Sequence, residues 1–262
     1  MSTRLQMADT GLRSLILIPA REGSRRFPGK PLAPLVSRQG VARPLIEWVW
    51  RAAVRAADPG DVVVATDSER IAAVVASFGG SAVMTSSSAR NGTERCAEAF
   101  ALLGRDVDVV VNLQGDSPLV PPAHLAALLA AFADPRVQMA TPYLTCDAAM
   151  SARLRGDYAA GRIGGTCVTR RQDGTALYFS KAPIPHGANE LDLHVGLYGY
   201  RPEALKRYAA LPVSPLEEAE GLEQLRLLEA GLPVHLVEVA LPEGGLWEVN
   251  NPEDVPLVEA LL

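Results

Sequence analysis

A basic loop lies near the amino terminus, within the sequence PAREGSRRFPGKP of residues 19–31. Its cations are Arg21, Arg25, Arg26 and Lys30. Side chains of this kind at short spacings can clamp a polyphosphate, and Gly23 and Gly29 open the backbone amides to it. The loop is not a Walker P-loop, because five residues separate these glycines and Pro31 follows Lys30. The chemistry favours an anion site, and the alternative is a solvated surface loop.

A carboxylate occupies a comparable position later in the chain, in the sequence VNLQGDSPL of residues 111–119. An apolar run ends there in Gln114, Gly115 and Asp116. A carboxylate that faces a basic phosphate loop is a natural Mg²⁺ ligand. The alternative is that Asp116 only caps the following turn.

Both motifs follow segments that the sequence predicts as buried strands. The predicted strands of the first half are 14–20, 61–67, 81–86 and 107–116, and the predicted helices are 43–57, 68–79, 93–104 and 121–133. Alternating strands and helices predict an α/β fold with a doubly wound, mostly parallel sheet. Ligands of such sheets bind outside the carboxyl ends of the strands. The basic loop and Asp116 should therefore meet at that edge.

The second half of the chain has a looser pattern. Further strands are predicted at 138–144, 165–171, 176–181 and 194–201, then a helix at 214–231, a strand at 234–239 and a capped helix at 251–262. Successive strands joined by loops indicate an antiparallel section or a dimerisation arm, which we place at 140–200. We expect residues 1–262 to form a single domain.

Composition narrows the possible classes of protein. The chain has 262 residues, of which 48% are hydrophobic, and a net charge of −5. These values allow a large core and argue against general binding to nucleic acid or to anionic membranes. Three cysteines without CxxC spacing make a disulfide framework or zinc site unfavourable. No apolar run is long enough for a signal peptide or a membrane span, so we expect a soluble cytoplasmic protein.

The sequence resembles the CTP-dependent cytidylyltransferases that activate 3-deoxy-manno-octulosonate (KDO), which have the nucleotide-diphospho-sugar transferase fold. The resemblance covers nearly the whole chain. It is carried by residues 18–32, 62–72, 91–99, 112–122, 176–185, 194–201, 214–231 and 250–255.

The resemblance implies a role for each matching residue. It gives a catalytic role to Arg21, Arg26 and Lys30, which would neutralise charge on the triphosphate. It gives a catalytic role also to Asp116, which would hold Mg²⁺. It assigns nucleotide binding to Ala20, Arg21, Ser24, Arg26, Lys30, Thr66, Asp67, Gly92, Thr93, Arg95 and Gln114. It assigns the sugar-acid pocket to Gln114, His194, Tyr198, Glu223 and Gln224. His194 and Tyr198 could instead be packing residues, and Glu223 could lie on a solvated helix face. The resemblance also implies a homodimer.

Three departures from the family pattern concern the acceptor and the metal. Asn250 stands where the family has a second metal-binding aspartate, and its amide oxygen can coordinate Mg²⁺ but carries no charge. Either metal binding is weaker, a neighbour such as Glu248 substitutes, or the acceptor brings its own charge to the metal. Arg90 precedes Asn91 and Gly92, where the family has His-x-Ser-Gly, and Arg162 lies in the divergent segment 161–171. Two added cations would suit a smaller, more anionic acceptor, such as phosphonoformate, as an alternative to KDO.

Two further functions use the same motifs. A non-catalytic nucleotide-binding protein would explain Asn250, but not the complete set of basic and acidic residues at strand ends. A sugar-1-phosphate nucleotidyltransferase that uses UTP or dTTP would share the fold, but the segments 194–201 and 222–226 favour an acid acceptor.

Overall fold

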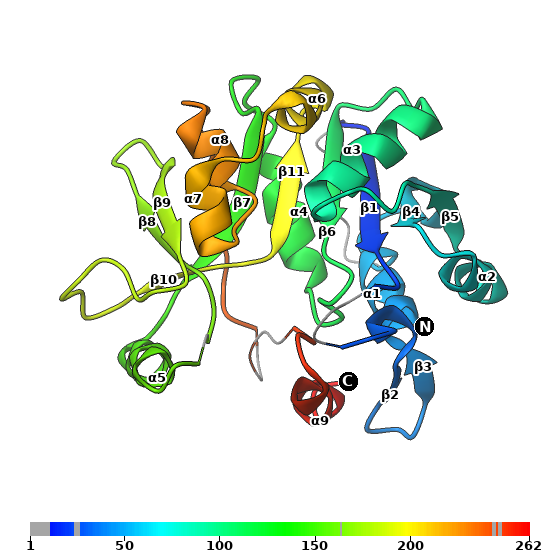
Figure 1. Ribbon diagram of the computed structural model, residues 1–262, viewed down its shortest axis with the longest axis horizontal. Coiled ribbons are helices and arrows are strands. Elements are labelled where there is room, and N and C mark those ends of the chain that lie inside the picture. The colour runs from blue at the N-terminus through cyan, green and yellow to red at the C-terminus, as the bar shows by residue number, and fades with distance from the viewer. Residues whose placement is uncertain (1–10, 24–26, 163, 243–244, 246–247) are drawn as a thin grey trace.

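The apolar runs assemble into one mixed sheet, which has ten strands among the residues described here (Figure 1). The computed structural model describes residues 11–23, 27–162, 164–242, 245 and 248–262. The strand order is β5-β4-β1-β6-β11-β7-β10-β8-β9, and β12 pairs with β7. Ser24 and Arg26 lie outside the described residues. No helix within the described ranges is long and apolar enough to cross a membrane.

One half of the sheet is parallel. Its strands are β1 (Ser14–Ala20), β4 (Val62–Thr66), β5 (Ser81–Met84) and β6 (Val109–Leu113). They pair in parallel, with β1 between β4 and β6. The four strands predicted from the sequence are thus confirmed. The strand predicted for 107–116 is shorter than expected, so Gln114 and Asp116 lie in the turn that follows β6.

The other half is mainly antiparallel. Its strands are β7 (Met139–Thr145), β8 (Cys167–Arg170), β9 (Ala176–Ser180), β10 (Asp192–His194), β11 (Leu197–Tyr200) and β12 (His235–Glu238). Within it β12 alone, among the described strands, pairs in parallel, with β7. This half confirms the predicted antiparallel section and joins the parallel half through β11, which pairs with both β6 and β7.

Helices cover both faces of the sheet. The helices are α1 (Leu45–Ala53), α2 (Glu69–Ser77), α3 (Gly92–Leu103), α4 (Pro122–Ala131), α5 (Ala148–Ala159), α6 (Pro202–Ala210), α7 (Pro215–Glu220), α8 (Leu225–Glu229) and α9 (Val255–Glu259). Successive side chains of a strand point to opposite faces. Ile16 and Ile18 of β1 therefore pack in a core with α1, α2 and α4, and Leu15 and Leu17 pack with α3, α6 and α8. Figure 1 shows α3, α6, α7 and α8 in front of the sheet.

The single helix predicted for 214–231 is wrong, because it divides into α7 and α8. Gly221 ends α7 in the left-handed conformation at φ 62°, which turns the chain away from the helix axis. The predicted terminal helix begins as a short 3-10 turn, Pro252–Asp254, before α9. Its predicted cap, Asn251, is confirmed by a reciprocal capping box with Asp254. The sequence did not predict α5, α6 or the hairpin of β2 (Pro34–Val36) and β3 (Ala42–Pro44).

Candidate active site

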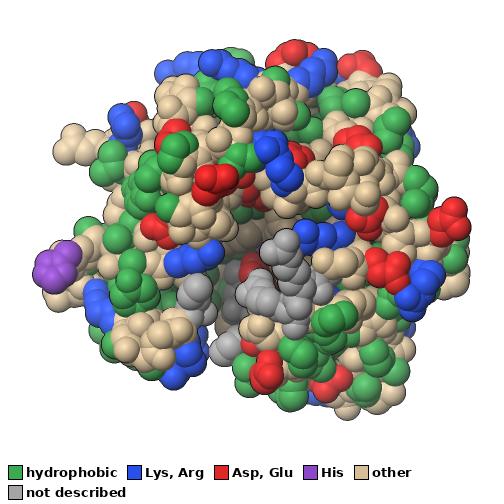
Figure 2. Space-filling view, viewed as in Figure 1, with side chains coloured by type: hydrophobic (Ala, Val, Ile, Leu, Met, Phe, Trp, Pro, Cys, Tyr) green, Lys and Arg blue, Asp and Glu red, His purple; other side chains and the backbone are tan. Residues whose placement is uncertain are grey.

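The candidate site lies at the carboxyl ends of β1, β4 and β6. The segment after β12 returns to this edge, where the Val249 N–H donates a hydrogen bond of 2.9 Å to the Asp116 carbonyl. In Figure 2 the visible face has a hollow near its centre, with basic side chains on either side and an acidic side chain within. Segments far apart in the sequence thus meet where the two motifs were expected.

Lys30 and Asp116, the ends of the two motifs, are in contact. Lys30 Nζ lies 2.7 Å from Asp116 Oδ2 and donates a second hydrogen bond of 2.9 Å to the Val249 carbonyl. Gly29, with φ 68°, allows the loop to turn into the 3-10 helix Lys30–Leu32 that starts with this lysine. The Lys30 side chain is only 14% exposed, so little water screens the pair.

A second carboxylate, Glu248, lies beside this pair. The Ser117 hydroxyl donates to Glu248 Oε1 over 3.4 Å, and Asn250 also hydrogen-bonds the carboxyl group. Burial, and then the charge of Asp116, raise the pKa of Glu248 above its usual range. Glycine at position 196 leaves room for this carboxylate, because a Cβ there would lie 2.8 Å from Glu248 Oε1. The site therefore gathers two carboxylates and one amide.

Several residues predicted to bind the nucleotide gather around Arg95, which is 3% exposed. Its guanidinium contacts Asp67 Oδ2 at 2.9 Å and Thr85 Oγ1 at 2.6 Å. Asp67 in turn accepts a hydrogen bond of 3.3 Å from the Glu22 N–H, in the basic loop. Thr66 is buried at the end of β4. Arg95 and Asp67 are thus paired with each other, and their contacts connect the segments that follow β1, β4 and β5.

Close backbone approach explains two glycines of the site. A Cβ on Gly115 would lie 2.5 Å from the Pro19 carbonyl oxygen, and one on Gly92 would lie 3.1 Å from the Gln114 side chain. Asn91 caps α3 by accepting a hydrogen bond of 2.8 Å from the Glu94 N–H. The start of α3 therefore lies against the ends of β1 and β6, where a helix amino terminus favours an anion.

Arg21 is the described arginine of the loop, and it differs from Lys30 in its surroundings. It follows the buried Ala20 at the end of β1 and is exposed. No partner for its guanidinium occurs among the described residues.

The predicted acceptor residues come together on the other side of Gln114. Glu223 accepts hydrogen bonds from the Thr93 N–H at 3.0 Å and from Gln114 Nε2 at 3.3 Å. Burial raises the pKa of Glu223 to about 7. Gln114 thus contacts both Glu223 and the start of α3. It lies two residues before Asp116 in the sequence.

His194, Tyr198 and Gln224 are the remaining predicted acceptor residues, and they lie together. The His194 ring centroid lies 5.3 Å from that of Tyr198, and the Tyr198 hydroxyl donates to Gln224 Oε1 over 3.4 Å. Burial lowers the pKa of His194 to about 3, so its ring is neutral. His194 Nε2 lies 2.8 Å from Thr141 Oγ1. Gln224 Nε2 is buried and has no hydrogen-bond partner among the described residues. A buried donor of this kind is costly unless a ligand accepts its bond.

The two added cations are already paired. Arg90 contacts Glu94 at 2.6 Å and Arg162 contacts Asp157 at 2.6 Å. Both arginines are more than half exposed, and their partners are less so. The printed sequence could have indicated both pairs, since each acid lies four or five residues from its arginine. The two arginine charges that suggested a more anionic acceptor are thus each paired with a carboxylate of the protein.

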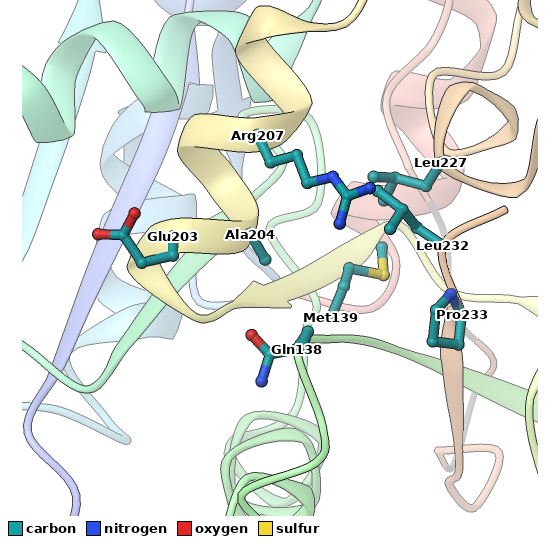
Figure 3. A pocket seen from close by; sticks show the side chains of 8 residues that line it. All are labelled: Gln138, Met139, Glu203, Ala204, Arg207, Leu227, Leu232 and Pro233. Atoms are coloured by element: carbon teal, nitrogen blue, oxygen red, sulfur yellow. The ribbon is translucent and has the colours of Figure 1, made fainter. Parts of the chain in front are cut away.

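A separate cavity of about 180 Å³ lies at the amino end of β7 (Figure 3). It is lined by Gln138, Met139, Glu203, Ala204, Arg207, Leu227, Leu232 and Pro233. Because β7 runs in the same direction as β6, this cavity lies at the edge opposite the candidate site. It holds none of the predicted site residues.

Comparisons with known proteins agree with this arrangement. A protein-family profile described as "Cytidylyltransferase" matches residues 15–238. The 3-deoxy-manno-octulosonate cytidylyltransferase of Maricaulis maris (strain MCS10) is 44% identical, over 95% of this chain and 96% of that protein. The 8-amino-3,8-dideoxy-manno-octulosonate cytidylyltransferase of Shewanella sp. (strain W3-18-1) is 38% identical, over 95% and 98% respectively.

Solved structures give the same result. The structure of CMP:2-keto-3-deoxy-manno-octonic acid synthetase complexed with CTP has a TM-score of 0.81 and 37% identity, and covers 95% of this chain and 98% of that one. A putative glucose-1-phosphate thymidylyltransferase from Bacillus anthracis is similar in fold alone, with a TM-score of 0.62 at 17% identity over 95% and 94%. The fold and the profile match define a cytidylyltransferase, a nucleotidyl-transferring enzyme. More particularly, the chain belongs to the 3-deoxy-manno-octulosonate cytidylyltransferase family.

Proposed function

We propose that this enzyme transfers the cytidylyl group of CTP to 3-deoxy-manno-octulosonate and releases pyrophosphate. The position of Gln114 is the observation that supports this most. Its side chain contacts Glu223 and lies against Gly92, while Asp116 follows two residues later beside Lys30. A nucleotide on one side of Gln114 would thus face an acid on the other.

The proposed transfer forms a bond between an acceptor oxygen and the α-phosphorus of CTP and breaks the bond to the β-phosphate. Negative charge then gathers on the leaving pyrophosphate. Arg21 is exposed, Lys30 is already at the site, and Arg26 belongs to the same loop. Cations at these positions would stabilise the leaving group through charge-assisted hydrogen bonds.

The donor groups beside Lys30 fit Mg²⁺. Asp116, Glu248 and Asn250 offer two carboxylates and an amide oxygen, and hard oxygen donors are what this cation prefers. A bound Mg²⁺ would add charge neutralisation on the phosphate oxygens. We place Glu248 in the role of the second acidic ligand, because the family aspartate is replaced by Asn250. Calorimetric titration of Mg²⁺ into wild type and into Glu248→Gln should show weaker binding to the variant.

The sugar acid is favoured over a phosphonate acceptor. The predicted acceptor residues offer the neutral His194, the Tyr198 hydroxyl and Gln224 Nε2, a donor without a partner among the described residues, and these groups suit an acceptor with several hydroxyl groups. Arg90 and Arg162 are neutralised by their own carboxylates and supply little free charge for a phosphonate.

Pyrophosphate release is the test. The enzyme would be given CTP and Mg²⁺ with KDO, with the 8-amino sugar acid and with phosphonoformate in parallel. Turnover with KDO is expected, and turnover with phosphonoformate alone would contradict the proposed acceptor. CTP binding without release with any acid would instead indicate a non-catalytic protein, and faster turnover with UTP or dTTP would contradict the nucleotide.

A further inference from the structure

Arg226, outside the pocket, is the most buried charge of this region. Its side chain is 1% exposed. Its guanidinium makes a two-bond fork with Glu217, with both hydrogen bonds at 2.6 Å, and a third of 2.9 Å with Glu94. It also lies over the Tyr208 ring, 4.5 Å from the centroid. Each of the three guanidinium nitrogens therefore donates a hydrogen bond, and an aromatic ring lies against the group.

Both carboxylates also hold the start of α3. Glu94, in the first turn of α3, is bound by Arg90 at 2.6 Å. Glu217 lies 3.3 Å from Asn91 Nδ2, and Asn91 is the residue that caps α3. Arg226 thus joins α7 to the helix start that lies beside the predicted nucleotide pocket.

The turn between α7 and α8 lies between these attachments. It contains residues 221–224, with Glu217 before it and Arg226 after it. Glu223 and Gln224, the predicted acceptor ligands, belong to this turn. Glu223 is itself bound to the Thr93 N–H, one residue before Glu94. Three contacts to residues 91–94 therefore set the position of the turn.

We propose that Arg226 is a positioning residue for the acceptor: its fork to Glu217 and its bond to Glu94 hold the turn that presents Glu223 and Gln224. The inference rests on the proposed function of the same pocket. An arginine is needed, because the ammonium group of lysine cannot make the planar fork and the third bond together.

The main test is Arg226→Lys, which keeps the charge and loses the fork. We expect its KM for the acceptor to rise about tenfold or more. The kcat at saturating acceptor and the Kd for CTP, measured by calorimetry without acceptor, should change less than threefold. An unchanged acceptor KM would overturn the inference. Equal losses in CTP affinity and acceptor KM would do so too, because they indicate general damage to the fold.

A second variant separates positioning from folding. Arg226→Met alone leaves the buried Glu217 carboxylate without its charged partner, whereas Glu94 keeps Arg90, so Glu217→Gln is combined with it to remove both members of the buried pair. This double variant should fold, bind CTP and keep the high acceptor KM. A wild-type acceptor KM in the folded double variant would show that Arg226 only balances charge.

Arg201→Lys is the matched control. Arg201 is also partly buried, donates to the Phe132 and Asp108 carbonyls and lies over the Phe132 ring, outside the pocket. The acceptor KM of Arg201→Lys should stay within twofold of wild type.

The wild-type enzyme distinguishes the two proposals. Absence of pyrophosphate release with every acceptor overturns the proposed function and this inference together. Turnover by wild type with an unaffected Arg226→Lys overturns only the inference.

Discussion

At the scale of single residues, Lys30 has the clearest expected effect. It neutralises Asp116 in the free enzyme and is placed to meet the triphosphate. Lys30→Ala should lower kcat/KM by about a hundredfold or more, because one removed electrostatic donor costs roughly that much in comparable sites. Steady-state pyrophosphate release measures it. Lys206→Ala, on the exposed surface of α6, is the control and should leave the rate unchanged. A near-wild-type Lys30→Ala enzyme would remove this lysine from the catalytic group.

Glu223 gives a prediction for pH dependence. Its usual pKa of 4.5 is raised in the fold to about 7, chiefly by burial. Between these values the folded protein binds more protons than the unfolded chain, so this group's contribution to stability falls as pH rises from about 4.5 to about 7. Glu223→Gln removes that loss. The melting temperature of the Glu223→Gln variant minus that of wild type should therefore be more positive at pH 8 than at pH 5. A difference between the two proteins that is the same at both pH values would contradict the raised pKa.

At the scale of elements, the sequence predicted the parallel half well and the second half less well. The strands β1, β4 and β6 are almost continuously apolar because helices cover both their faces, and that signal is visible in the printed sequence. The break between α7 and α8 was missed, because the helical periodicity of 214–231 continues through it. Its cause is tertiary: Arg226 and Glu217 draw two short helices toward α3.

Gly221 makes that break possible, and it supplies a prediction at the same scale. It has φ 62°, and a Cβ there would also lie 2.8 Å from Lys181 Nζ. Gly221→Ala should destabilise the protein by about 1–2 kcal/mol, the usual cost of a left-handed non-glycine residue. Urea unfolding measures it, and the acceptor KM should rise as the turn shifts.

Gly156→Ala is the control for this substitution. Gly156 lies within α5 with open space around its missing Cβ, so alanine should stabilise the protein by about 0.5–1 kcal/mol. Equal effects of the two substitutions would show that the left-handed conformation at Gly221 carries no cost.

At the scale of the whole molecule, the sequence predicted the edge of the sheet where the candidate site lies, but not all the residues that meet there. Lys30 and Asp116 could be predicted because each follows an apolar strand, and such strand ends converge. Glu248 was only a substitute candidate, since its place depends on the small Gly196 and on the return of the chain after β12. Local charge pairs such as Arg90 with Glu94 decide which cations remain free for a ligand. The resemblance of the sequence to a family does not show which side chains are paired in this way.

The expected homodimer is also a property of the whole molecule. β9 ends the sheet, within the 140–200 region, and carries Leu177 with 55% of its surface exposed. An apolar strand at a sheet edge is a ready surface for another chain. We therefore expect light scattering after size exclusion to give twice the mass of the chain, and Leu177→Lys to shift the protein toward monomer, because a charge would be buried at the contact. Leu102→Lys, at a similarly exposed position on α3, should leave the mass unchanged. A dimer unaffected by Leu177→Lys would place the contact elsewhere, and a monomeric wild type would show that the edge of β9 remains exposed to solvent.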